Sequence, residues 1–413
     1  MSKRSNVLIG ALAAVLVAGL ARPAAASAGN GIRLGGSEGR LHPYLDLETR
    51  YDSNLYYASP GVNVADGILH VRPGVLLAVP GETTAVDLRA ELDWAQYLGL
   101  EGKTSNLSQL YGDAALSVGV NRHGTLGLEL TDGFQRNANT SSFSLGSALI
   151  SNENELRVAV PWTPGGGALI LTLGGEWQLV TYDPYLDGTL CTDPNAQCNS
   201  TTLSKLGWNE LRGTGEVRWK FLPRTAWVLD GGYFSRLPEN RTLSAKVSGF
   251  RVSTGLSGLV TSRLVSVLKG GFGQTSGDVS FDTWLATAEL EWLLSETSSA
   301  RLGYMHDLGT DSGTVLSVYQ SNRVYADAHV LLAGRFTGRL GGSWERRSYA
   351  HVAADATLLR IEPAIEAEVT RWLRASLGYA YTDRTSKFPA GVTALPGYAY
   401  SKNEVWLRST FTY

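Results

Sequence analysis

Residues 86–94 alternate strictly between apolar and charged side chains. One parity carries Val86, Leu88, Ala90, Leu92 and Trp94, and the other carries Asp87, Arg89, Glu91 and Asp93. A period of two is that of a β-strand, in which successive side chains point to opposite faces. Four consecutive charges on one face cannot lie in a dry core, because burying unpaired charge costs too much free energy. One face of this strand must therefore contact water while the other contacts an apolar phase.

The same alternation recurs from Leu41 to the end of the chain and predicts a protein built of strands. We expect strands at residues 41–52, 69–79, 86–94, 107–120, 125–135, 153–161, 168–182, 205–222, 225–237, 246–260, 264–274, 282–294, 299–308, 317–333, 336–348, 356–369, 372–384 and 399–413. Tight turns such as Pro80-Gly81 alternate with longer polar loops such as 136–151, as in an up-and-down barrel. The predicted fold is all-β, a transmembrane antiparallel up-and-down β-barrel of about 18 strands. Sixteen strands is the alternative, because the pattern blurs near residues 246–274.

The first residues have the layout of a secretory signal peptide. Lys3 and Arg4 precede an apolar run at 7–20, and Ala26-Ser27-Ala28 forms a small-residue cleavage site. The run is shorter than the roughly 20 residues that a membrane-spanning helix needs. We expect residues 1–28 to be removed on export and residues 29–413 to form a single transmembrane β-barrel domain. Only residues 29–40 precede the first expected strand, so we expect no plug domain.

The charge and the cysteines narrow the possible partners. The formal net charge of −2 gives no reason to expect nucleic acid as a partner. Cys191 and Cys198 lie in one polar loop of a chain expected to be exported, so a local disulfide is predicted. A metal pair is the alternative, and no histidine lies nearby to support it. The loop either folds over the mouth of the barrel or is a stapled surface loop without a gating role.

The charged parity of the strands collects both signs in nearly equal number. Such a wall needs water or dense pairing, and barrels of 16–18 strands leave an aqueous lumen. We therefore expect a water-filled pore. Some inward positions are aromatic, among them Tyr44 and Trp406, and they either stack on sugar rings or pack against the wall. The candidate lumen-lining residues are Arg50, Arg72, Arg89, Glu91, Asp93, Arg212, Arg218, Asp230, Glu289, Glu291, Arg323, Tyr325, Arg339, Arg360, Glu362 and Arg408.

The last strand ends the chain on an aromatic residue. Its apolar parity includes Val405, Leu407, Phe411 and Tyr413. This segment resembles the closing strand of a bacterial outer-membrane barrel, in which the terminal strand is also the assembly signal. The resemblance implies that Phe411 and Tyr413 are that signal and that the barrel assembly machinery is a partner. Outward tryptophans near strand ends suit aromatic girdles at the two membrane interfaces.

Catalytic motifs are absent from the sequence. Asp327 and His329 share a face and could orient an imidazole, but no nucleophile motif surrounds any histidine. No cluster of His, Asp and Glu has metal-ligand spacing. We expect no enzyme activity, no catalytic residues, no cofactor and no metal.

The segment from Arg50 to Tyr56, reading RYDSNLY, closes the first strand. It resembles the R-x-D-x-N opening of a family of Gram-negative outer-membrane β-barrel porins that accompany exopolysaccharide export. The resemblance implies a pore that passes a secreted exopolysaccharide or capsule across the bacterial outer membrane. It also implies two partners, outer-membrane lipid and a periplasmic polysaccharide-export protein. A general or sugar-selective diffusion porin and a non-conducting structural or adhesive barrel are the alternatives.

Overall fold

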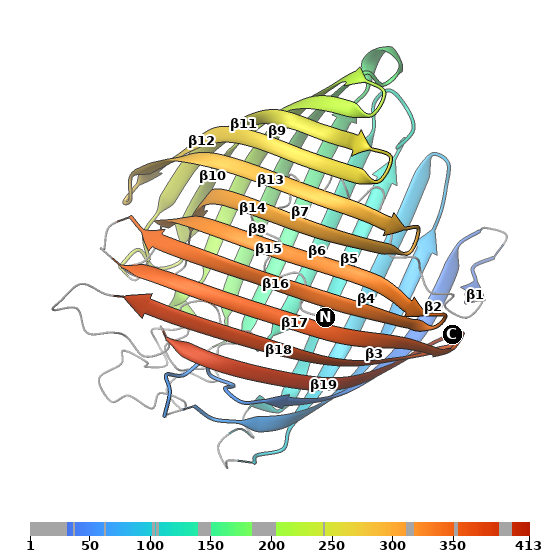
Figure 1. Ribbon diagram of the computed structural model, residues 1–413, viewed down its shortest axis with the longest axis vertical. Helices are drawn as coiled ribbons and strands as arrows, with labels where there is room; N and C mark the ends of the chain where they lie inside the picture. The colour runs from blue at the N-terminus through green and yellow to red at the C-terminus, as the bar shows by residue number, and fades with distance from the viewer. Residues whose placement is uncertain are drawn as a thin grey trace.

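The computed structural model describes residues 31–35, 38–61, 63–100, 104, 107–138, 150–183, 204–242, 244–310, 318–350, 354–387 and 399–413. The expected signal peptide, Cys191 and Cys198 lie outside these residues. Beside two short 3-10 helices, η2 (Pro164–Gly166) and η4 (Ser204–Leu206), the described chain is made of strands (Figure 1). Among the described residues, no helix has the length and hydropathy to cross a membrane.

The strands are long and follow one another closely along the chain. Their bounds are β1 (Ile32–Arg33), β2 (Arg40–Asp52), β3 (Asp66–Val79), β4 (Thr84–Tyr97), β5 (Gln109–Val120), β6 (Leu128–Asn137), β7 (Ser151–Trp162), β8 (Leu169–Tyr182), β9 (Trp208–Leu222), β10 (Thr225–Pro238), β11 (Val247–Thr261), β12 (Leu264–Gly277), β13 (Phe281–Ser295), β14 (Ser298–Thr310), β15 (Val318–Ala333), β16 (Phe336–Tyr349), β17 (Asp355–Thr370), β18 (Leu373–Lys387) and β19 (Tyr400–Thr412).

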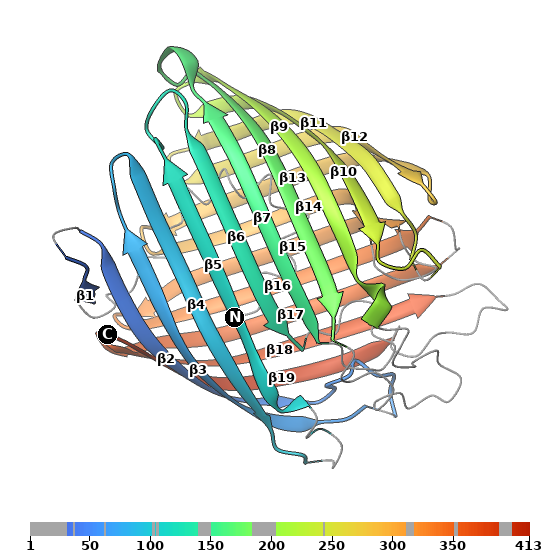
Figure 2. The same ribbon diagram turned by 180° about the vertical axis from the view of Figure 1, so that it is seen from behind.

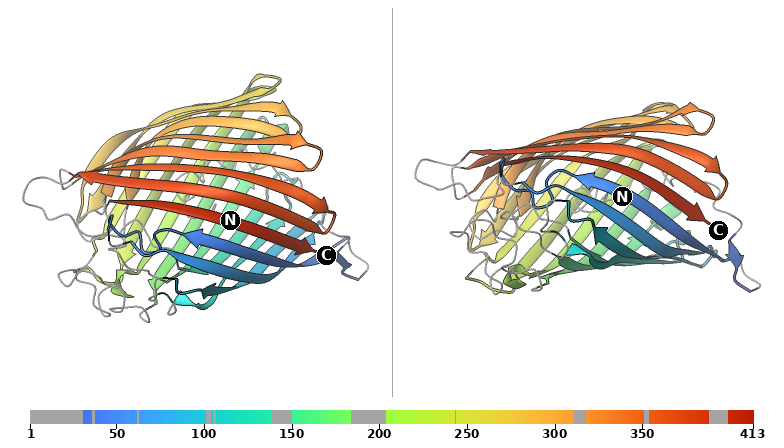
Figure 3. Two further views of the ribbon diagram at one scale, coloured as in Figure 1. Left: turned by 60° about the horizontal axis from the view of Figure 1, so that its bottom comes forward. Right: turned by 90° about the horizontal axis from the view of Figure 1, so that it is seen from below.

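Strands β2 to β19 form a closed antiparallel barrel of 18 strands, as the sequence predicts. Each strand pairs with the next along the chain, and β19 pairs with β2 to close the wall. Seen from behind and from below, the blue β2 lies beside the red β19 (Figures 2 and 3). Closure leaves no exposed sheet edge, which hydrocarbon would not tolerate. The two-residue β1 pairs with the start of β2 and adds nothing to the circumference.

The region in which the sequence pattern blurs contains two full strands, β11 and β12. They pair with each other from Val247 opposite Gly277 to Thr261 opposite Leu264. Small residues such as Gly255, Ser257 and Gly271 occupy inward positions here, so the contrast between the two parities is weak. The count is therefore 18, and the alternative of 16 is wrong.

The two rims of the barrel differ in their connections. At the short-turn rim, which includes the C-terminus, most turns are tight, such as residues 223–224 and 334–335. At the opposite long-loop rim the connections are generally longer, such as residues 53–65. The exceptions are the turns 121–127 and 163–168 at the short-turn rim and the three-residue connection 278–280 at the long-loop rim. The latter follows Gly277, whose φ of +113° is open to glycine and strained for other residues.

The outer face is apolar and carries aromatic side chains at two heights. On β19, for example, Val405 and Leu407 are exposed while Glu404 and Arg408 are buried. A lower ring near the short-turn rim contains Trp162, Trp219, Trp227, Trp292, Trp372 and Tyr413. An upper ring toward the long-loop rim contains Trp94, Trp177, Trp284, Trp344 and Tyr379. We call these rings the lower and upper girdles.

The spacing of the girdles fits a membrane. Trp284 and Trp292 lie eight residues apart on β13, and both are more than half exposed. Eight residues span about 26 Å along a strand, and a tilt near 40° reduces this to about 20 Å across the membrane. That is close to the roughly 25 Å apolar band of outer-membrane barrels.

Candidate functional site

The inner wall is lined by arginines that pair with carboxylates on their own strand. Residues two apart on a strand share a face, so an Arg-x-Glu or Glu-x-Arg triplet brings both charges to the same side. Such pairs are Arg50–Glu48 at 2.7 Å, Arg89–Glu91 at 3.2 Å, Arg157–Glu155 at 2.5 Å, Arg212–Glu210 at 2.5 Å, Arg218–Glu216 at 3.3 Å, Arg347–Glu345 at 2.7 Å and Arg360–Glu362 at 2.8 Å. At these seven positions the charges of the wall are neutralised locally, pair by pair.

Other ion pairs join neighbouring strands. Asp93 on β4 contacts His70 at 2.9 Å and Arg72 at 3.1 Å, both on β3. Arg72 also contacts Glu48 on β2 at 2.9 Å. Farther along the wall, Glu176 on β8 contacts Arg212 on β9. These contacts brace the wall across the strands and fix the side chains that face the interior.

The R-x-D-x-N motif lies at the seam where β2 meets β19. Arg50 contacts Glu404 at 3.3 Å, and Asp52 contacts Lys402 at 2.7 Å. The Asn54 side-chain amide donates to the Ser401 carbonyl at 3.1 Å. All three motif residues therefore contact the closing strand or its start. Lower on the same seam, Arg408 and Asp46 form an ion pair.

The motif continues into a loop that folds inward. The Asn54 side chain bonds both the backbone N–H and the carbonyl of Ala58, at 2.8 Å each, and this clamps the turn. Leu55, Tyr56 and Ala58 are buried against inward side chains of β3 to β5. Burial near the Asp66 carboxylate raises the pKa of Tyr56 to about 12, so its hydroxyl stays neutral. Residues 53–65 therefore narrow the mouth on this side.

Asp66 ties a second loop to the first. Its carboxylate accepts hydrogen bonds from the backbone N–H groups of Gly99 and Leu100, at 3.1 and 3.0 Å. The Thr104 hydroxyl donates to the same carboxylate at 2.5 Å. Asp66 is fully buried, and its hydrogen bonds offset the cost of burying the charge.

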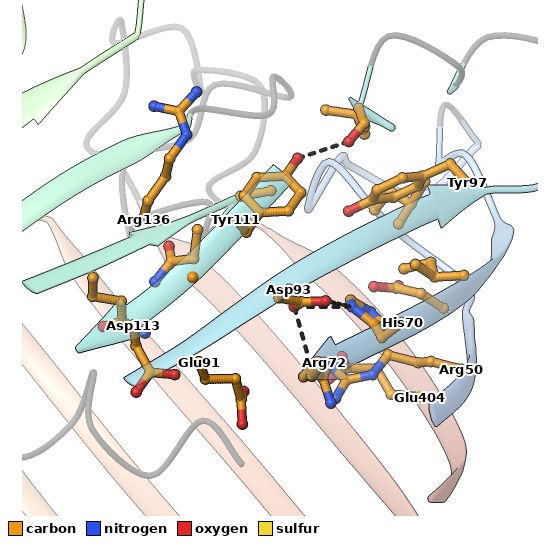
Figure 4. Close-up of a pocket in the computed structure, with 18 of the residues that line it drawn as sticks. Arg50, His70, Arg72, Glu91, Asp93, Tyr97, Tyr111, Asp113, Arg136 and Glu404 are labelled. Carbon is orange, nitrogen blue, oxygen red and sulfur yellow. Dashed lines mark hydrogen bonds and ion pairs between the residues drawn. The ribbon is translucent and has the colours of Figure 1, made fainter. Parts of the chain in front are cut away.

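A recess of about 200 Å³ opens on the inner wall below these loops. Residues of six strands, β2 to β6 and β19, line this recess. These strands face a common space only on the concave inner side of the barrel, so the recess lies inside it. Figure 4 shows His70 and Arg72 directed at Asp93, with Tyr97 and Tyr111 nearer the mouth. Six of the candidate lumen-lining residues line the recess, namely Arg50, Arg72, Arg89, Glu91, Asp93 and Arg408.

The other candidate residues lie on the same face of the wall. Asp230 pairs with Lys269, Tyr325 donates to Glu289 at 2.5 Å, and Arg339 pairs with Glu366 at 3.0 Å. Glu291 lies 3.7 Å from Arg301, and Arg323 stacks over the Tyr325 ring at 5.5 Å. Arg212, Arg218, Arg360 and Glu362 belong to the same-strand pairs above. Lining of a conducting lumen by these residues stays a prediction.

Lys402 and Lys269 contribute buried charges that the sequence-based set leaves out. Lys402 compensates Asp52, and Lys269 compensates Asp230. Their inward parity, shared with Glu404 and Val267, is the signal that identifies them.

Three of the inward aromatic rings lie flat against the wall. A Cβ placed on Gly74, Gly303 or Gly378 would come within 2.4 Å of the rings of Tyr44, Tyr325 and Trp406, respectively. Each glycine is the direct cross-strand partner of the ring that covers it. Glycine is needed at these positions because any side chain would lift the ring from the wall. These aromatic residues were expected either to stack on sugar rings or to pack against the wall. Their position in the structure is that of packing against the wall.

The end of the chain completes the seam on the outer face. The backbone N–H of Tyr413 donates to Pro43 at 3.1 Å, and Phe411 stacks on Trp372 with ring centroids 6.0 Å apart. Tyr413 is 67% exposed. Tyr413 belongs to the lower girdle and Phe411 packs on its Trp372, and the role of Phe411 and Tyr413 as an assembly signal stays a prediction.

A closed barrel with an apolar outer band and two aromatic girdles is the architecture of outer-membrane barrels. The protein is a β-barrel of a Gram-negative outer membrane. The short-turn rim then faces the periplasm and the long-loop rim the exterior.

Comparison with known proteins gives structural similarity alone. No family model and no curated protein matches the sequence. Among solved structures, it is similar to a mutant ferric enterobactin receptor, PfeA, from Pseudomonas aeruginosa, with 10% identity over 92% of this chain and 81% of that chain and a TM-score of 0.48. It is also similar to Pseudomonas aeruginosa OpdK with vanillate (13% identity, 90% and 98% covered, TM-score 0.46) and Acinetobacter baumannii OccAB3 (10%, 91% and 99%, 0.46). The narrower resemblance to exopolysaccharide-associated porins is not confirmed by these comparisons.

Proposed function

We propose that the protein is an outer-membrane channel that passes a secreted polysaccharide, an exopolysaccharide or capsule, out of the cell. The observation that carries the proposal is the pairing of charges on the inner wall. Arginines and carboxylates alternate along the strands and neutralise each other within 2.5 to 3.3 Å in the same-strand pairs. We propose no catalytic activity for this site.

A wall of paired charges suits a neutral, hydroxyl-rich cargo. A surface with little net charge does not concentrate ions of one sign in the lumen. Paired guanidinium and carboxylate groups still have free donor and acceptor positions for hydroxyl groups, since a guanidinium has five N–H donors. Many weak contacts of this kind allow a long chain to bind and to move on, because no single site holds it tightly.

The R-x-D-x-N segment adds a weaker argument. It resembles the opening of porins that accompany exopolysaccharide export, and here Arg50, Asp52 and Asn54 hold the seam and the inward loop. Because this motif holds the barrel wall together, its presence does not distinguish one transported molecule from another. It therefore supports the barrel type more than the polysaccharide itself.

Deletion of the gene tests the proposal directly. We expect surface polysaccharide to be lost while uptake of small solutes is unchanged, and a plasmid copy to restore it. Polysaccharide that remains at the surface of the deletion strain would refute export as the function.

A second candidate, a general or sugar-selective diffusion porin, is favoured by the inward loop 53–65 and the recess beneath it. A loop folded into the mouth narrows a channel to small solutes. Planar-bilayer conductance that oligosaccharides block, together with slow sugar uptake in the deletion strain, would select this alternative.

A further inference from the structure

Asp132 on β6 is a carboxylate on the lipid-facing side of the barrel. It has the same parity as Phe134 and Leu128, which are exposed on the outer face. Gln135, of the opposite parity, lines the inner recess. Asp132 therefore points outward, away from the water-filled side of the wall.

Its height lies between the two girdles. Direct cross-strand partners form a row across β3 to β8 that reads Leu77, Leu88, Leu116, Asp132, Leu156 and Trp177. The row begins two residues from the short-turn rim, at Leu77, and ends at Trp177 in the upper girdle. Asp132 thus lies within the apolar band, flanked by leucines on both neighbouring strands. Other outward charges on the described strands, such as Asp282, Asp355 and Asp383, lie near the long-loop rim.

The donors available to Asp132 within one barrel are few. In the described part of the chain, its hydrogen-bond partner is the Asn154 side-chain amide on β7, at 3.3 Å. Charge-assisted hydrogen bonds are usually nearer 2.7–2.9 Å, so this contact satisfies the carboxylate weakly. Lipid tails offer no donor, and an ionisable group at this depth calls for a partner.

We propose that a second copy of this chain packs on the face of β6 to β9 around Asp132. Asp132 and Asn154 lie side by side and offer an acceptor and a donor on one patch. A two-fold axis through the patch sets the Asn154 amide of each copy against the Asp132 carboxylate of the other, so the surface is complementary to itself. Neither lipid tails nor an apolar partner would supply the missing donors.

The surface beside this pair permits close approach. Gly175 on β8 and Gly213 on β9 are direct cross-strand partners and both are exposed. A Cβ added to either would meet no atom within 4 Å, so they form a depression on the outer face. Leu173 and Leu211 next to them are 70% and 58% exposed and stand out from the wall. Small residues beside large apolar ones favour tight packing between membrane proteins.

Sedimentation equilibrium of the purified full chain in a density-matched detergent tests the proposal. We expect the wild type to be a dimer. Asp132→Leu should raise the dimer dissociation constant by at least about tenfold, because hydrogen bonds to a charged group are lost. Gly213→Leu should have a similar effect by filling the depression, without a clash inside its own barrel. Thr49→Leu, which replaces an exposed lipid-facing polar residue on β2, should leave the constant unchanged.

Folding of each variant is checked separately by the heat-dependent gel mobility of intact barrels, which should be the same for all four proteins. A wild type that sediments as a single barrel at every concentration would overturn the proposal. So would dimers of the Asp132→Leu variant as stable as those of the wild type. A monomeric wild type that loses bound lipid on Asp132→Leu would assign the patch to a lipid instead.

Discussion

Two parts of the inner wall use the same residue types in different ways. Near the seam, formed by β2 to β4 with β19, buried ion pairs cross from strand to strand in addition to the same-strand pairs of Arg50 and Arg89. The side chains of Asp52 and Lys402 are only 4% and 5% exposed. On the adjacent wall, formed by β15 to β17, the side chains of Arg360 and Glu362 are 36% and 35% exposed and belong to one strand. The seam pairs join the strands that close the barrel, whereas the Arg360–Glu362 pair joins two residues of one strand.

The difference follows from the physics of closure. The seam is the joint between the two ends of the chain, and β19 and β2 share nine directly opposed pairs of residues, as few as any joint of the barrel. The next joint, between β2 and β3, has 13. Buried cross-strand pairs add contacts where the backbone ladder is short. Breaking a buried pair is costly, whereas an exposed pair contributes little because water and salt screen it.

Loss of the end of β19 should have the largest effect. A chain truncated before Phe411 loses the pairing of Phe411 with Leu45 and the hydrogen bond from Tyr413 to Pro43. An open strand edge then faces hydrocarbon. We expect no assembled barrel in the outer membrane, measured by heat-dependent gel mobility of membrane fractions. Correct insertion of the truncated chain would contradict this expectation.

Removing one carboxylate from each wall compares the two regions directly. Glu48, with a side chain 1% exposed, compensates Arg50 and Arg72, so Glu48→Gln should lower the free energy of unfolding by about 3–5 kcal/mol. Glu362→Gln on the adjacent wall should cost less than about 1 kcal/mol, because its pair with Arg360 is partly exposed to water. Denaturant unfolding of barrels in lipid vesicles measures both. Equal losses for the two variants would remove the distinction between the walls.

The inward loop should respond to Asn54 more than to Asn63. Asn54→Ala removes the clamp on Ala58 and the bond to Ser401, which should loosen residues 53–65 by about 1–3 kcal/mol. We expect a larger single-channel conductance. Asn63→Ala loses one exposed hydrogen bond, to Ser53, and should behave as the wild type. If both variants conduct like the wild type, the loop does not narrow the pore.

A methyl group added at Gly74 should lower the stability of the barrel more than one added at Gly341. Gly74→Ala collides with the Tyr44 ring and should weaken its hydrogen bond to Glu91, at a cost of about 1–3 kcal/mol. On the adjacent wall, a Cβ at Gly341 meets its nearest atom at 3.5 Å, so Gly341→Ala should be nearly neutral. Thermal unfolding of the two variants gives the comparison, and a neutral Gly74→Ala would mean that the ring is not held against the wall.

Reduction of the predicted disulfide between Cys191 and Cys198 should have the smallest effect. We expect a stapled surface loop without a gating role, so conductance should not change when a reductant is added on the side of the loop. A change in conductance, absent from a variant with serine at both positions, would instead make the loop a gate.

Most of the fold could be predicted from the sequence, because lipid outside and water inside impose strict alternation. Residues 86–94 already contain that signal, and all 18 strands follow from it. Boundaries moved by a few residues, as at Asp66, where β3 begins earlier than the apolar pattern does. The blurred region near β11 failed to give a firm count because glycine and serine carry no contrast between the faces.

The sequence predicts which side chains of the site point inward, but not which residues they pair with. Parity identifies Arg50 and Asp52 as inward, but their pairing with Glu404 and Lys402 depends on the register of β19 against β2. No local pattern specifies that register, since the two strands lie at opposite ends of the chain. The inward fold of residues 53–65 was also missed, because a polar loop looks the same in sequence whether it stands outward or packs inside.

The central claim is that the inner wall is locally neutral, and the reversal potential of a single channel tests it most directly. In a planar bilayer with a tenfold gradient of potassium chloride, we expect a stable current that reverses within a few millivolts of zero, because neither ion is concentrated in the lumen. A reversal potential approaching about 59 mV of either sign, the limit for one permeant monovalent ion, would contradict the claim.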